Sequence, residues 1–145
     1  MLLPFRSGLV RTSPFDPECA ALADRHYSRQ THGSPQFAGN GQKVILRDGE
    51  ARELFVWLWQ TYRLDGQAGY NAAMFRNEGS RLSSDVILEA ERCVVAAWGP
   101  NRAFTYVDPI KVRSPNPGYC FKVAGWIRVG ESRAGAHLLE KWLRA

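Results

Sequence analysis

Apolar positions near the middle of the chain recur with a helical period. In residues 83–98, SSDVILEAERCVVAAW, apolar side chains fall on one face and charged side chains on the other. Either Ser83 or Ser84 is expected to cap the helix, which begins near Ser84, and Gly99-Pro100 ends it. One face of this helix is therefore expected to pack on a core.

Short apolar segments at 72–77 and 102–107 flank this helix and predict strands. A strand, helix and strand of this length most simply form parallel neighbours with a right-handed crossover. Ligands of such units bind at the carboxyl ends of the strands, beside the helix N-terminus. The candidate site therefore gathers polar residues at these ends: Asn77, Glu78, Gly79, Ser80, Ser83, Ser84 and Asp108.

The N-terminal part predicts a short strand over 7–13 and then a helix, with Asp16 as N-cap and Pro17 at its first position. We expect this helix to end near Tyr27 or Ser28. The densest polar stretch of the chain follows its apolar part: Arg25, His26, Tyr27, Ser28, Arg29, Gln30 and His32. A solvated helix end and a substrate site remain two open interpretations of it.

The pair His26 and His32 lacks companion ligands at suitable spacing, so we expect no metal site. Residues 33–42 are turn-forming and predict a mobile surface loop able to cover a site.

A hairpin follows, with strands at 44–47 and 53–59 joined by the Asp48-Gly49 turn. Both faces of 53–59 are apolar, which indicates a central strand, and its two tryptophans are expected to pack in the core rather than against bases. The polar connection over 60–71 carries Tyr62, Arg63 and Tyr70, a mixture that suits base binding but is also common in exposed loops.

Three prolines make 107–119 irregular, and Lys111 and Arg113 form a basic cluster there with Arg102. A short helix ending at Gly125 should follow. The last two segments are expected to be strands, although the apolar spacing of the final one also suits a helix.

Composition indicates one domain spanning 1–145, because 145 residues with 45% hydrophobic content can bury a core. We find no linker or repeat that would divide the sequence. The formal net charge of +5 permits a polyanionic partner without demanding one. The three isolated cysteines are expected to be reduced thiols. We see no signal peptide and no membrane-length apolar run, so we expect a cytoplasmic protein without a membrane partner.

The predicted order of elements resembles that of the GNAT N-acetyltransferase fold, which implies an α/β (α+β) protein with a central mixed sheet of about six to seven strands and flanking helices. Four motifs resemble, in order and spacing, the Mom family of phage DNA-modification proteins over nearly the whole chain: HYSR, RNEGSRLSSDVI, WG…FTYVD and GYCFKVAGW.

The resemblance implies an enzyme that extrudes adenine from double-stranded DNA and transfers a carbamoylmethyl-type group to its exocyclic amine, protecting phage DNA from restriction in the host cytoplasm. Its implied roles are catalytic for His26, Tyr27, Tyr106 and Asp108, donor-binding for Gly79, Arg81, Ser83 and Ser84, and substrate- or DNA-binding for Ser28, Arg29, Asn77, Glu78, Arg102, Lys111, Arg113 and Tyr119.

The group donor, a small molecule or a carrier-bound group, is not identified by the resemblance. Acetyltransferases hold coenzyme A phosphates with Q/R-x-x-G-x-G/A before the central helix. Here Gly79 alone of that motif is present, so the phosphate-binding motif is degenerate. Acetyl-CoA is one option for the donor. Phe121 stands where the family often has a tyrosine acid, and Tyr119 is its nearest substitute. An acetyl-CoA-dependent N-acetyltransferase of a small molecule or protein, and a non-catalytic DNA-binding module, are the alternatives. A second copy of the chain is left open as a partner.

Overall fold

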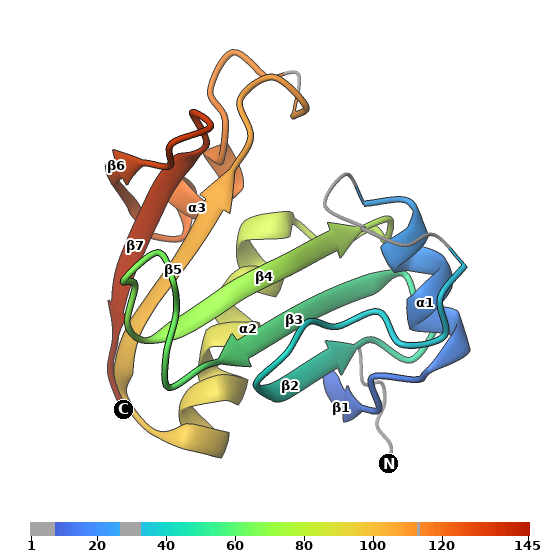
Figure 1. Cartoon of the computed structure of the whole chain (residues 1–145). Coiled ribbons are helices and arrows are strands. Elements are labelled where there is room, and N and C mark those ends of the chain that lie inside the picture. Colours follow the sequence, from blue (N-terminus) through green and yellow to red (C-terminus); the bar gives the residue numbers. More distant parts are fainter. Residues whose placement is uncertain (1–7, 27–32, 113) are drawn as a thin grey trace.

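The computed structural model describes residues 8–26, 33–112 and 114–145 (Figure 1). The elements follow in the order β1 (Val10–Thr12), α1 (Pro17–Asp24), β2 (Gln42–Arg47), β3 (Glu53–Trp59), β4 (Tyr70–Asn77), α2 (Ser83–Trp98), β5 (Asn101–Val107), α3 (Tyr119–Val123), β6 (Ile127–Glu131) and β7 (His137–Leu143). This order agrees with the prediction, and the final segment is a strand. The class is therefore α and β with one mixed sheet of seven strands.

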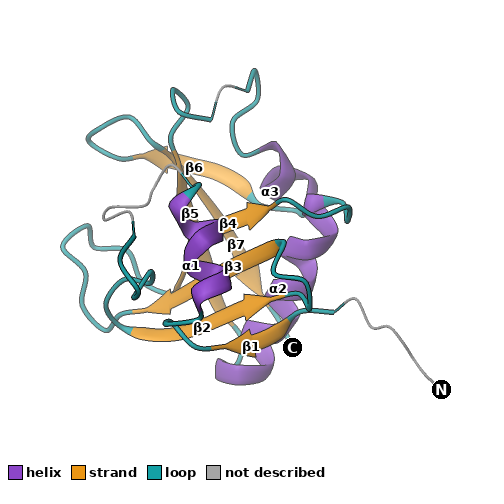
Figure 2. Ribbon diagram, turned by 90° about the vertical axis from the view of Figure 1, so that its right-hand side faces the viewer, coloured by secondary structure: helices purple, strands orange, loops and turns teal. Residues whose placement is uncertain are grey.

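The sheet runs in the order β1-β2-β3-β4-β5-β7-β6, and β4 with β5 is its parallel pair. Helix α2 crosses one face of the sheet with α3 beside it, and α1 lies on the other face (Figures 1 and 2). Trp57 is fully buried on the α2 face and donates from Nε1 to the Ala90 carbonyl oxygen, while Val56 and Leu58 pack on the α1 face. The predicted core position of this tryptophan is confirmed.

The segment at 33–42 differs from its prediction as a mobile surface loop. Phe37 and Ala38 are buried against α1 and β3 side chains in the smaller hydrophobic cluster. Burial of an aromatic ring removes apolar area from water, so this part of the segment contributes to the core.

One helix cap and one helix end differ from prediction. Helix α2 begins at Ser83, close to its predicted start, but its N-cap is Leu82, whose side chain cannot cap it, and the Ser83 hydroxyl accepts from the Asn77 amide. Helix α1 ends at Asp24, before the predicted end. The Asp16 cap is confirmed: its Oδ1 accepts from the amides of Glu18 and Cys19.

Strands β4 and β5 pair only at their beginnings, through Tyr70 with Ala103 and Asn71 with Phe104. In the β3–β4 ladder, Val56 is opposite Met74 and Trp57 is opposite Ala72, so Ala73 is an extra residue in β4. Such a bulge bends its strand and increases the local twist. The bend accounts for the divergence of β4 from β5 beyond Asn71, which is visible in Figure 1.

Candidate functional site

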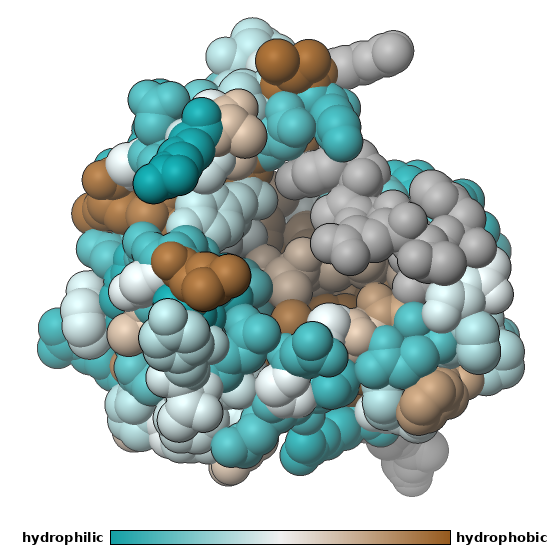
Figure 3. Space-filling view, viewed as in Figure 1, coloured by the Kyte–Doolittle hydropathy of each residue, from teal (hydrophilic) through white to brown (hydrophobic). Residues whose placement is uncertain are grey.

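A pocket of about 150 Å³ lies where the two parallel strands separate. Figure 3 shows this face of the molecule hollowed between the two halves of the sheet. The pocket is lined by residues of both strands, of α3 with its preceding loop, and of the segment just after α1: His26, Ala72, Ala73, Met74, Phe75, Thr105, Tyr106, Val107, Val112, Gly118, Cys120 and Phe121. It therefore occupies the carboxyl-terminal halves of a parallel strand pair, as the chain order predicts.

The facing edges of β4 and β5 form part of the pocket wall. Beyond Asn71 and Phe104 the facing edges of β4 and β5 have no ladder pairing with each other in the described chain. The buried Thr105 hydroxyl donates to the Ala72 carbonyl oxygen over 2.7 Å and so bridges the strands just past their last paired residues. Peptide groups further along these edges face the gap and can hydrogen-bond a ligand.

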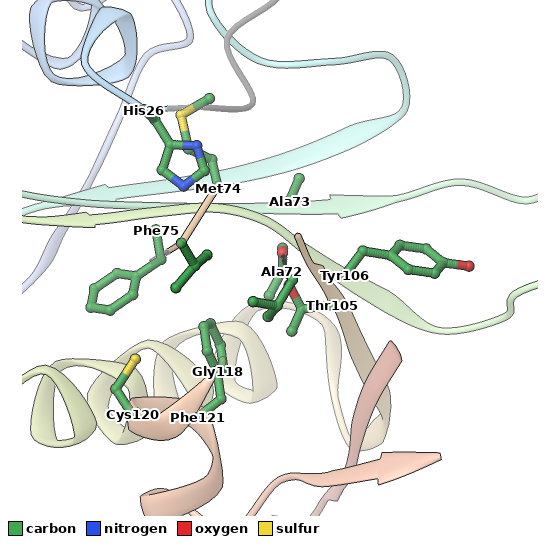
Figure 4. Close-up of a pocket in the computed structure, with 12 residues that line it drawn as sticks. His26, Ala72, Ala73, Met74, Phe75, Thr105, Tyr106, Gly118, Cys120 and Phe121 are labelled. Carbon is green, nitrogen blue, oxygen red and sulfur yellow. Dashed lines mark hydrogen bonds between the residues drawn. The ribbon is translucent and has the colours of Figure 1, made fainter. Parts of the chain in front are cut away.

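The described lining contains no aspartate, glutamate, lysine or arginine, and His26 is its one side chain that can take up a positive charge. Burial, and then the neighbouring positive charge of Arg76, lower the pKa of His26 to about 4. The imidazole is therefore neutral at pH 7, with one nitrogen able to accept a hydrogen bond. Figure 4 shows this ring beside Met74, above the apolar side chains of the pocket.

Tyr106 is among the lining residues, but Figure 4 shows its ring directed away from the other labelled side chains. The Tyr106 hydroxyl donates to Asp65 Oδ2 over 3.1 Å, and burial, followed by this carboxylate, raises the pKa of Tyr106. Cys120 is on the opposite wall, where burial raises the pKa of its thiol and keeps it protonated. Among the described lining residues, the His26 imidazole is thus unprotonated at pH 7, while the Tyr106 hydroxyl and the Cys120 thiol keep their protons.

The predicted donor-binding Arg81 is held by two carboxylates. Its Nη2 and Nε donate to the two oxygens of Glu53, at 2.7 and 3.1 Å, and its Nη1 donates to Glu89 at 2.6 Å. Glu53 is only 3% exposed, and Glu89 also accepts from the Leu9 amide. This triad ties the start of α2 to β3 and to the chain before β1, and all three guanidinium nitrogens already donate to carboxylates within the protein.

The other predicted residues between β4 and α2 are tied to one another. Asn77 donates to the Arg81 carbonyl and to the Ser83 hydroxyl, and its Oδ1 accepts from the Gly79 amide. Ser84 is buried. None of these residues is in the described pocket lining, and their donor-binding role stays a prediction.

The predicted DNA-binding residues lie at several places on the surface. Glu78 accepts from Arg25 and Arg76, and the hydrogen bond from Arg25 is the main cause that lowers its pKa to about 2. Arg102 is only 14% exposed, because it pairs with Glu140 at 2.6 Å and donates to the Ala68 carbonyl. Its guanidinium is therefore already engaged inside the protein.

Asp108 follows β5 but does not line the pocket in the described structure. Its Oδ1 accepts from the amides of Ile110 and Lys111, which fixes the turn that carries the exposed Lys111 side chain. Tyr119 is exposed at the start of α3, next to two lining residues. Tyr27, Ser28, Arg29 and Arg113 lie outside the described residues.

The structure thus brings His26 and Tyr106 together at the pocket and leaves the other described candidates outside its lining. Sequence reasoning missed the lining contributed by Thr105, Met74, Phe75 and Cys120. Their signal was present in part, because Met74, Phe75 and Thr105 lie on the two predicted strands, whose carboxyl ends were expected to hold the site. The prediction rests on polar residues at and after the strand ends, whereas these lining side chains lie within the strands and α3.

In the part of the chain that the structure describes, no group of three or more histidine, cysteine, aspartate or glutamate side chains is placed to hold a metal ion. No helix within that part is long and apolar enough to cross a membrane. Comparison with protein families, curated proteins and solved structures gives no match for this chain.

Proposed function

We propose that this protein is a group-transferring enzyme that modifies the exocyclic amine of adenine in DNA, in the manner of the phage Mom family. The base would leave the helix and enter the pocket between β4 and β5. The observation that carries the proposal is the chemistry of the described pocket lining, which is apolar and aromatic with a neutral imidazole at its rim.

An uncharged lining favours an uncharged acceptor. The ammonium group of a lysine or polyamine would lose its hydration in the pocket without a carboxylate among the described lining residues to pair with it. The positive charge of Arg76 near His26 adds to this cost. A nucleobase is planar and neutral, and aromatic side chains such as Phe75 and Phe121 suit its faces.

The neutral His26 would accept a hydrogen bond from the adenine amine, whose lone pair is delocalised into the ring and needs such assistance. In the transfer, a bond forms between this nitrogen and the carbon of the donated group. The bond from that carbon to its carrier breaks, with the electron pair leaving on the carrier. The amine proton passes to His26, which later releases it to water.

The test is to express the chain in a bacterial host, digest total DNA to nucleosides and search by mass spectrometry for a heavier deoxyadenosine. We expect a new nucleoside with the natural sequence and at least about a hundredfold less with His26→Ala, the loss that removing a general base causes. His137→Ala, which removes a histidine outside the pocket lining, is the matched control and should retain modification. Absence of a modified nucleoside from cells that contain the folded protein would refute the proposal.

An acetyl-CoA-dependent N-acetyltransferase is the second candidate, and one observation favours it. The unpaired edges of β4 and β5 offer peptide groups to an extended donor that carries amides. Calorimetric titration with acetyl-CoA separates the candidates: micromolar binding together with unmodified host DNA would favour the acetyltransferase.

A further inference from the structure

The connection between β3 and β4 holds an apolar side chain out in solvent. Leu64 is 96% exposed and occupies the second position of a turn closed by the Gly66 amide donating to the Arg63 carbonyl. Single exposed apolar residues are common on proteins. Here, however, Leu64, Ile110 at 84% and Tyr62 at 79% are the most exposed large hydrophobic residues of the described chain, and two of them share this connection.

The turn that carries Leu64 is held rigidly. Arg63 donates from Nε and Nη2 to both oxygens of Asp65, at 2.9 and 2.7 Å, and from Nη1 to Gln60. The Gln67 amide also donates to Asp65. These contacts order the turn before any partner arrives, so little conformational entropy is lost when Leu64 inserts into a partner.

The same turn is joined to the pocket. Asp65 accepts from the hydroxyl of Tyr106, one of the residues that line the pocket, and Arg63 lies over the buried Phe104 ring of β5. Ile110 stands four residues after Tyr106, in the turn fixed by Asp108 and next to the exposed Lys111. Figure 3 shows hydrophobic groups over both connections on the face that contains the hollow.

We propose that Leu64 is the wedge that enters the base stack of duplex DNA when the target adenine turns into the pocket. This inference rests on the proposed function. Proteins that unstack DNA insert apolar side chains between base steps, and the side chain must protrude from a firm support close to the pocket that receives the base. Leu64 protrudes from such a held turn, which the hydrogen bond between Tyr106 and Asp65 connects to the pocket lining, and the net charge of +5, with Lys111 beside the second apolar turn, complements the phosphates.

The test compares initial modification rates on a matched duplex and on the single strand of the same sequence, chosen from the context modified in host DNA. Leu64→Ala should lower the duplex rate at least about tenfold and leave the single-strand rate within about twofold, because a single strand needs no unstacking. Leu64→Met, which keeps an apolar wedge, should restore most of the duplex rate. Val10→Ala, an exposed apolar residue on β1, is the control and should change neither rate.

A second readout does not require catalysis. With 2-aminopurine at the target position of the duplex, the natural protein should raise its fluorescence on binding, and Leu64→Ala should not. Equal duplex rates for Leu64→Ala and the natural protein would overturn the wedge while leaving the proposed function intact. If the natural protein modifies neither substrate, the proposed function fails and the wedge fails with it.

Discussion

Removing Arg81 should destabilise the protein strongly, because its partner Glu53 is almost completely buried. In Arg81→Ala the Glu53 carboxylate, 3% exposed, loses both of its guanidinium hydrogen bonds, and Glu89 loses a third. Breaking a buried pair by removing one partner typically costs about 3–5 kcal/mol. That is a large part of the roughly 5–15 kcal/mol by which domains are stable.

Urea unfolding followed by tryptophan fluorescence measures this cost. With a slope of about 2 kcal/mol per molar urea, a loss of 4 kcal/mol moves the midpoint down by about 2 M. Adding Glu53→Gln to Arg81→Ala should recover part of the loss, since no unpaired buried charge then remains at that position.

Arg52→Ala, which breaks the solvent-exposed pair with Glu50, is the control and should cost less than about 1 kcal/mol. An Arg81→Ala midpoint within about 0.3 M of the natural protein would show that the triad contributes little. The guanidinium would then be available for the donor-binding role that the sequence predicts.

Two further predictions concern the pocket. The pKa of His26 falls from 6.5 to about 4 on folding. Between these two pH values the unfolded chain binds a proton at His26 and the folded protein does not. The free energy of unfolding should therefore decline as pH falls from about 6.5 to about 4. His26→Gln should flatten that part of a stability profile measured by urea midpoints; an unchanged slope would contradict the lowered pKa. The pKa values of Asp65 and Glu78 fall on folding from 3.8 and 4.5 to about 2, so their contributions are lost as pH falls from those ordinary values toward 2 and overlap only the acid end of the His26 window. Thr105→Val should cost about 1–3 kcal/mol, because it removes the buried bond to the Ala72 carbonyl, whereas Thr61→Val at an exposed site should stay within about 0.5 kcal/mol. Equal unfolding midpoints for the two threonine variants would refute the bridging role.

Local patterns were sufficient to predict the elements of this fold. The helical period of 83–98 and the apolar strands beside it depend on neighbours within a few residues, and α2 begins within one residue of its prediction. The predicted cap residue was wrong. Leu82, which has no polar side chain, occupies the N-cap position, and the Ser83 hydroxyl accepts from Asn77, six residues earlier.

The candidate site could be predicted by region but less well by residue. The carboxyl ends of β4 and β5 do contain the pocket. Arg81, however, pairs with Glu53, which is 28 residues away along the chain, and Arg102 pairs with Glu140, 38 residues away. Sequence alone shows such side chains as available charges, because their partners become visible only when the sheet order is known.

The narrow join between β4 and β5 has a consequence for the order of folding. Strands β2, β3 and β4 pair with sequence neighbours, and such local contacts form early. Strands β4 and β5 are separated along the chain by the whole of α2, so their pairing closes a long loop. This pairing adds only two residue pairs to the ladder. We therefore expect the pocket to appear last, when two preformed halves dock, so that a ligand bound there would slow their separation more than any other opening of the molecule.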